Sequence, residues 1–124
     1  MLKTIVLAAA LAATSLTATA FAEDLTDANY ATAARCIALA GQPQLASDGF
    51  DVAGLQAAFH QQAGRRSPAA RAQAREAERA ANRIARRSPE AILRVQREQA
   101  CSAFVTMGLA NNGQTAAGSA PSMP

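Results

Sequence analysis

Residues 88–110 read SPEAILRVQREQACSAFVTMGLA, and this stretch decides the fold that we expect. Ser88 followed by Pro89 is typical of a helix start. A serine hydroxyl can accept from an unpaired backbone N–H, and proline loses nothing at the first helical position. One set of residues recurs at helical spacing and predicts the face that packs inward: Ile92, Val95, Gln99 and Ala103. The opposite face carries the charged residues Arg94, Arg97 and Glu98.

The second half of this stretch, from Ala100 to Leu109, is apolar on nearly every side. A helix that is apolar all round is normally buried on all sides. Asn111, Asn112 and Gly113 then favour a helix end, because asparagine and glycine tolerate the left-handed cap conformation. We therefore expect residues 88–110 to form the central helix of the fold, on which the other helices pack.

Residues 1–22 have the pattern of a cleaved signal peptide. Lys3 precedes a short apolar run over residues 5–13, and Ala20-Phe21-Ala22 fits the rule of small residues at a cleavage site. The apolar run is too short for a spanning helix, which needs about 20 residues. We expect a periplasmic or secreted bacterial protein that begins at Glu23 and keeps no transmembrane anchor after cleavage.

The remaining chain has the length of one domain, which we place at residues 23–113. Helical patterns cover residues 25–41, residues 51–63 and a segment that starts at Ser67-Pro68, with Thr26, Asp51 and Ser67 as caps. Residues 114–124 have no periodicity and no charge, which is typical of a disordered tail. The fold class is all-α, and the sequence leaves open a small four-helix bundle or an irregular helical domain.

The third helix has two different sides. A seam of small and apolar residues predicts packing on another helix: Ala70, Ala74, Ala77, Ala81 and Ile84. Arginines step by four along the other side and form the candidate binding face: Arg71, Arg75, Arg79 and Arg83. Glu76 and Glu78 stand at the right spacing to pair with Arg79 and Arg75, although such pairs stabilise a helix by only tenths of a kcal/mol.

Cys36 and Cys101 are the two cysteines of the chain, and an exported protein meets an oxidising compartment. We therefore expect a disulfide between them. A redox-active pair is disfavoured because the Cys-x-x-Cys spacing that lowers a thiol pKa is missing. Two free thiols remain an alternative. A bond that closes so long a loop stabilises a fold by roughly 4 kcal/mol in the chain-entropy model.

Catalytic and metal-binding patterns are sparse, so we expect no enzymatic activity and no cofactor. His60 is the single histidine and is most simply a surface residue. The alternative is a periplasmic haem or metal carrier that uses His60, with Met107 as a conceivable second axial ligand. A zinc site would need a cluster of four ligands, which the sequence does not show.

Charge is divided unevenly along the chain. Residues 23–64 carry five acidic residues against Arg35, whereas residues 65–100 carry ten arginines against four glutamates. One interpretation is a solvated face together with attraction between the two halves. The other is a non-enzymatic binding module whose arginine face docks on an acidic periplasmic protein or an anionic envelope surface. Nucleic acid is disfavoured by export and by the scarcity of aromatic residues. Small periplasmic helical proteins with one long-range disulfide include stress chaperones and immunity-type inhibitors. This analogy alone makes a periplasmic stress chaperone or an immunity-type inhibitor a further alternative.

Overall fold

The computed structural model describes residues 25–112, and the expected signal peptide (1–22) and tail (114–124) lie outside that range. Its elements are α2 (Asp27–Ala40), the 3-10 turn η2 (Pro43–Asp48), α3 (Ala53–Gln62), the 3-10 turn η3 (Ala63–Arg65), α4 (Pro68–Ala85) and α5 (Glu90–Thr106). An isolated bridge joins Asp51 and Asn111, and no strand forms within residues 25–112. The all-α fold class is confirmed.

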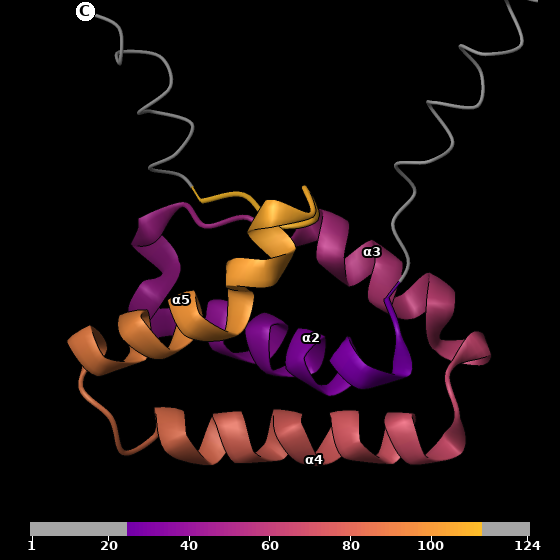
Figure 1. Cartoon of the computed structure of the whole chain (residues 1–124). Coiled ribbons are helices and arrows are strands. Elements are labelled where there is room, and N and C mark those ends of the chain that lie inside the picture. The colour runs from indigo at the N-terminus through magenta and orange to yellow at the C-terminus, as the bar shows by residue number, and fades with distance from the viewer. Residues whose placement is uncertain (1–24, 113–124) are drawn as a thin grey trace, which may run out of the picture.

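The central element is α2, not the helix formed by residues 88–110. Helices α3, α4 and α5 each pack against α2, which lies between them (Figure 1). Its buried residues are not confined to one stripe and so point to several sides of the helix: Tyr30, Ala33, Ala34, Cys36 and Leu39. Most of these side chains are small, so neighbouring helices can approach from more than one direction. The expectation that α5 is the centre was therefore wrong.

Helices α2 and α4 lie side by side and run in the same direction. At their N-terminal ends, the Ser67 backbone N–H donates to Asp27 Oδ1 at 3.2 Å. At their C-terminal ends, Gln42 Nε2 donates to Asn82 Oδ1 at 2.9 Å. Three residues of the expected seam are buried, Ala70, Ala74 and Ala81, whereas Ala77 and Ile84 are only partly buried. Ala85, which was not expected in the seam, is buried as well.

Helix α3 packs against α2 through aromatic side chains. The rings of Tyr30 and Phe59 are stacked with their centroids 4.2 Å apart, and the Tyr30 hydroxyl donates to the Phe59 carbonyl at 2.8 Å. Helices α3 and α4 follow one another in the chain but are not a closely packed pair. In a regular up-down bundle helices that follow one another pack together, so this arrangement differs from one.

The predicted inward face of α5 was wrong. The side chains of Ile92 and Val95 are 47% and 51% exposed, and Ala103 is exposed as well. The buried residues are instead Leu93, Arg97, Ala100, Cys101 and Phe104. The helix is turned this way because Cys101 must face α2, and Arg97 lies one turn before Cys101 on the same side. For the same reason the second half of α5 is not buried all round.

The caps follow the sequence at two helix starts and depart from it at the other two. Thr26 forms a capping box with Asn29, and Ser67 Oγ accepts from the Ala70 N–H. The expected cap Asp51 lies one residue before the N-cap of α3, which is Val52, although Asp51 Oδ1 accepts from the Ala53 N–H at 2.8 Å. Ser88, however, does not cap α5. Its hydroxyl donates to the Ile84 carbonyl at 2.8 Å and so satisfies the end of α4 instead.

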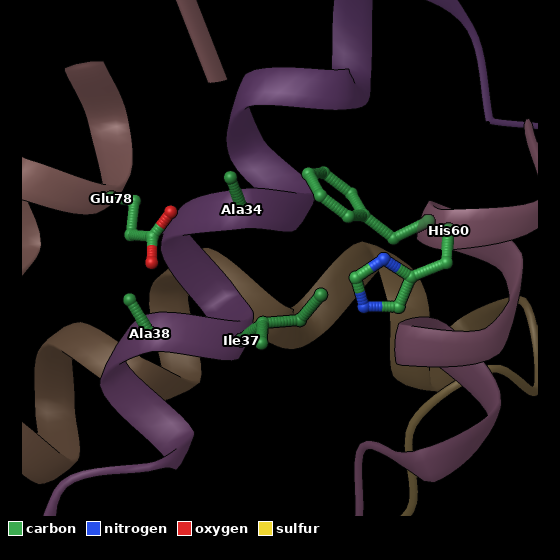
Figure 2. Close-up of a pocket in the computed structure, with 6 residues that line it drawn as sticks. Ala34, Ile37, Ala38, His60 and Glu78 are labelled. Carbon is green, nitrogen blue, oxygen red and sulfur yellow. The ribbon is translucent and has the colours of Figure 1, made fainter. Parts of the chain in front are cut away.

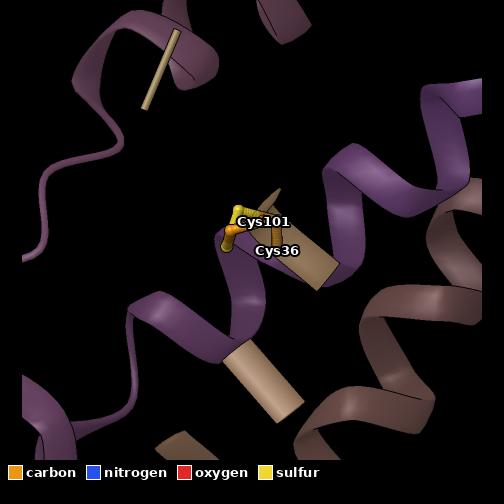
Figure 3. Close-up of a disulfide and its surroundings, with 2 residues drawn as sticks. All are labelled: Cys36 and Cys101. Atoms are coloured by element: carbon orange, nitrogen blue, oxygen red, sulfur yellow. A yellow bond between two sulfur atoms is a disulfide. The ribbon is translucent and has the colours of Figure 1, made fainter. Parts of the chain in front are cut away.

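The disulfide between Cys36 and Cys101 is confirmed. It joins the second half of α2 to the second half of α5, with 4.9 Å between the two Cα atoms. Figure 3 shows the bond between the two cysteines beside α2. Both cysteines are buried. The bond therefore crosses the core and fixes which side of α5 faces α2.

Candidate functional site

The arginines predicted as a binding face lie on α4, but Arg71 has a structural role. Its Nη1 donates to the Ala63 carbonyl at 3.0 Å and to the Arg66 carbonyl at 2.6 Å. These carbonyls belong to the η3 turn and the residue after it, and the Ala63 carbonyl also accepts from the Arg66 N–H. Arg71 is half-buried and holds the junction that leads into α4.

Arg79 and Arg83 share one carboxylate on the exposed side of α4. Glu76 accepts from Arg79 Nη2 at 3.0 Å and from Arg83 Nη2 at 3.3 Å. These two hydrogen bonds lower the pKa of Glu76, the Arg79 bond having the larger effect. All three side chains are about half exposed or more, so the pairs are screened by solvent and leave the guanidinium groups accessible.

Three further arginines of this region have no side-chain partner in the described part of the chain. Arg75, Arg86 and Arg87 are exposed and make neither an ion pair nor a side-chain hydrogen bond there. Arg86 and Arg87 were missed as site residues because they were interpreted only as a helix boundary. They continue the arginine series at steps of three and four beyond Arg83, which is the signal that could have found them.

We call the five exposed arginines of α4 and its C-terminal end the basic strip: Arg75, Arg79, Arg83, Arg86 and Arg87. Figure 1 shows α4 along one edge of the fold, with α2 on its inner side. At 1.5 Å per residue, Arg75 and Arg86 stand about 17 Å apart along the helix axis. The strip is therefore a narrow positive surface that solvent reaches along its whole length.

Two other arginines of residues 65–100, Arg94 and Arg97, form ion pairs within the fold. Asp48 accepts from Arg94 Nε and from Arg97 Nη1, each at 2.9 Å, and Arg94 also pairs with Glu90. Hydrogen bonding by Arg94 is the main cause that lowers the pKa of Asp48, and it raises the pKa of Arg94 in turn. The Arg97 guanidinium lies 4.7 Å from the centre of the Phe50 ring. This cluster ties η2 to α5.

The ion pairs thus explain part of the uneven charge distribution in structural terms. Asp48 from the acidic half pairs with Arg94 and Arg97 from the basic half, and Asp27 lies 3.6 Å from the Arg66 guanidinium. The attraction expected between the two halves is present. What this attraction does not neutralise is the basic strip, whose five arginines are exposed on α4 and on the turn that follows it.

His60 lies on the rim of a small hollow between helices. The hollow has a volume of about 180 Å³ and is floored by Ile37, with Glu78 on the opposite wall (Figure 2). His60 is exposed and stands edge-on to Phe59, with ring centroids 5.8 Å apart. Within residues 25–112 no three His, Cys, Asp or Glu side chains come together as a metal site. The haem or metal carrier stays an untested prediction.

No family model, no curated protein and no solved structure matches this chain. Function is therefore inferred from the surfaces themselves. Guanidinium groups present rigid forks of N–H donors that bind phosphate and carboxylate groups in pairs. The basic strip offers five such forks, three on α4 and two on the turn that follows it. Among the described helices, none is long and apolar enough to cross a bilayer.

Proposed function

We propose that this protein is an exported, non-enzymatic binding module whose basic strip docks on an anionic envelope surface. The observation that carries the proposal is the exposure of the strip, in which Arg75, Arg86 and Arg87 have no partner within residues 25–112. An exposed row of one charge sign attracts a partner of the opposite sign over the Debye length of roughly 8–10 Å.

Export is supported by two independent features. Residues 1–22 have the three parts of a signal peptide, and Cys36 and Cys101 form a disulfide of the kind that persists in oxidising compartments. A protein in the periplasm faces membranes that carry anionic lipid headgroups, which gives the strip a partner of the required sign. Protein recovered from the envelope fraction is expected to begin at Glu23, as its intact mass will report.

The expected affinity is low. Each arginine held near an anionic membrane contributes about 1 kcal/mol, so the five arginines contribute at most about 5 kcal/mol. That ceiling corresponds to a dissociation constant of roughly 0.2 mM. Glu76 lies beside Arg79 and Arg83 and weakens the attraction further. The proposed docking is therefore reversible, and it should be lost as salt rises.

The test uses vesicles of phosphatidylglycerol and vesicles of neutral phosphatidylcholine. The exported protein should sediment with the anionic vesicles at about 0.02 M salt and dissociate at about 0.3 M salt. The double variant Arg86→Gln/Arg87→Gln should lose most of this binding. Its control, Arg35→Gln/Arg65→Gln, removes the same charge from α2 and η3 and should bind nearly as the unchanged protein does.

Two results would count against the proposal. If neither vesicle type binds at low salt, the strip has no affinity for an anionic surface. If both double variants weaken binding equally, net charge acts without any contribution from the position of the strip. Salt-sensitive capture by an acidic protein, without vesicle binding, would assign the strip to a protein partner instead.

A further inference from the structure

A groove runs between helices α3 and α4, which both pack on α2 but are not a closely packed pair. Two hollows lie along it, with volumes of about 180 and 200 Å³, and both are lined by Phe59 and Glu78. They are therefore neighbours, and we call the two together the α3–α4 groove. Its floor is α2. Spaces between the helices of a bundle are a common place for a small ligand.

The first hollow, which has the volume of about 180 Å³, is mainly apolar. Four of its six lining residues carry no polar side-chain atom: Ala34, Ile37, Ala38 and Phe59. Figure 2 shows the carboxylate of Glu78 directed toward the side of α2 that carries Ala34 and Ala38, with His60 beyond Ile37. A cavity of about 150 Å³ is enough to hold a benzene molecule. This apolar hollow therefore has room for a branched aliphatic or an aromatic side chain.

The second hollow, which we call the charged hollow, brings two opposite charges to one place. Arg75 and Glu78 both line it, three residues apart on α4. Their spacing predicts an ion pair, but neither side chain makes an ion pair or a hydrogen bond within residues 25–112. Arg71 lines the same hollow, yet its Nη1 donates to the backbone carbonyls of Ala63 and Arg66. Arg75 and Glu78 are therefore the charged groups left free to bind a ligand here.

These charges select the class of ligand. An anion would be repelled by Glu78, and a cation would be repelled by Arg71 and Arg75, because like charges brought together oppose binding. A ligand with one positive and one negative group satisfies both free side chains. Residues three apart on a helix have their Cβ atoms about 5–6 Å apart. The ammonium and the carboxylate of an α-amino acid are joined through a single carbon atom, so they suit two groups this close.

We propose that the α3–α4 groove binds a free α-amino acid with an apolar side chain of the size of leucine or phenylalanine. Arg75 donates to the ligand carboxylate, and the ligand ammonium donates to Glu78. Because Glu78 lines both hollows, the ligand side chain reaches from there into the apolar hollow and packs on Ile37 and Phe59. Arg75 and Glu78 are exposed, so the expected dissociation constant is about 0.1–5 mM.

Amino-acid binding and vesicle docking depend on different residues. Arg75 belongs to the basic strip, but vesicle docking is tested through Arg86 and Arg87, which line neither hollow. The Arg86→Gln/Arg87→Gln variant should therefore keep amino-acid binding and lose vesicle binding. Glu78→Gln should do the reverse, so each proposal can fail while the other holds.

The test is a titration of the exported, oxidised protein with L-leucine up to about 20 mM, followed by amide chemical shifts. The shifts should concentrate at Ile37, Phe59 and Glu78. Three related ligands each lack one feature of leucine: leucinamide lacks the carboxylate, N-acetyl-leucine lacks the ammonium, and glycine lacks the apolar side chain. Leucinamide and N-acetyl-leucine should each bind about threefold to fivefold more weakly, which is the size expected of one solvent-exposed ion pair. Glycine should bind more weakly still.

Two variants separate the two ends of the ligand. Glu78→Gln should weaken leucine about threefold to fivefold without weakening N-acetyl-leucine, and Arg75→Gln should weaken leucine without weakening leucinamide. The matched controls Glu76→Gln and Arg79→Gln change the same charges on α4 outside both hollows, and they should bind leucine as the unchanged protein does. All four side chains are exposed, so each variant should keep the helical circular-dichroism spectrum.

A third variant, Ala38→Leu, places a larger side chain in the apolar hollow and should abolish leucine binding. Three results would overturn the proposal. The first is the absence of shifts at the groove residues, and the second is equal binding of leucine and its three relatives. The third is leucine binding that is weakened as much by Glu76→Gln as by Glu78→Gln, because net charge alone would then explain it.

Discussion

Removing the bond between Cys36 and Cys101 should destabilise the protein severely. The bond closes a loop of 65 residues, and the chain-entropy model assigns about 4 kcal/mol to a loop of that length. A domain the size of residues 25–112 has a total stability of about 4–13 kcal/mol. Loss of the bond should therefore remove between a third and all of the stability. At 4–8 °C per kcal/mol, the melting temperature should fall by about 15–35 °C.

The assay is urea unfolding followed by circular dichroism, with and without reductant. The variant Cys36→Ala/Cys101→Ala separates the bond from the packing of the sulfur atoms, because both sites are buried and alanine leaves no unsatisfied polar group. Its stability should not respond to reductant. If reduction shifts the unchanged protein by less than about 1 kcal/mol, the loop-closure reasoning is refuted.

Two further predictions concern Gly54 and Asp48. A Cβ atom at Gly54 would stand 2.9 Å from the Leu109 carbonyl oxygen, so Gly54→Ala should cost about 1–3 kcal/mol in urea unfolding. Gly64→Ala, with nothing within 4 Å, should be neutral or slightly stabilising, and equal losses would contradict the packing argument. Because Arg94 lowers the pKa of Asp48, the contribution of Asp48 is fully present above its unfolded value of 3.8 and is lost as pH falls below it. The stability advantage of the unchanged protein over Asp48→Asn should therefore disappear in acid, and a constant difference from pH 6 to pH 2 would refute the assignment.

The helix starts show where sequence reasoning succeeded and where it failed. Thr26 and Ser67 were predicted correctly as caps because each has its receiving N–H within the next three residues. Ser88 has the same local pattern as Ser67, Ser-Pro after two arginines, yet its hydroxyl turns back to the carbonyl of Ile84. Identical local sequence leaves both options open, and the path of the chain between α4 and α5 selects one.

The candidate binding face on α4 was also predictable only in part from the sequence. That arginines recur at helical spacing on α4 was visible in the sequence. Which of them are free was not, because Arg71 is occupied by backbone carbonyls of a turn that folds back onto it. Arg86 and Arg87 took its place in the basic strip only once the structure showed them exposed and without partners within residues 25–112.

By itself, the sequence determined that the chain is helical and where most helices begin, because both depend on local sequence preferences. It also determined that the two cysteines would pair, because the chain has no other cysteine with which either could bond. Tertiary structure decided which helix is central and which side of α5 turns inward. The apolar spacing favoured Ile92 and Val95 as the inward face of α5. Cys101, which bonds to Cys36, and Arg97, which pairs with Asp48, turn the opposite side of α5 inward instead. A helix can rotate about its axis at little cost to its own hydrogen bonds, so contacts with partners distant in the sequence decide its orientation.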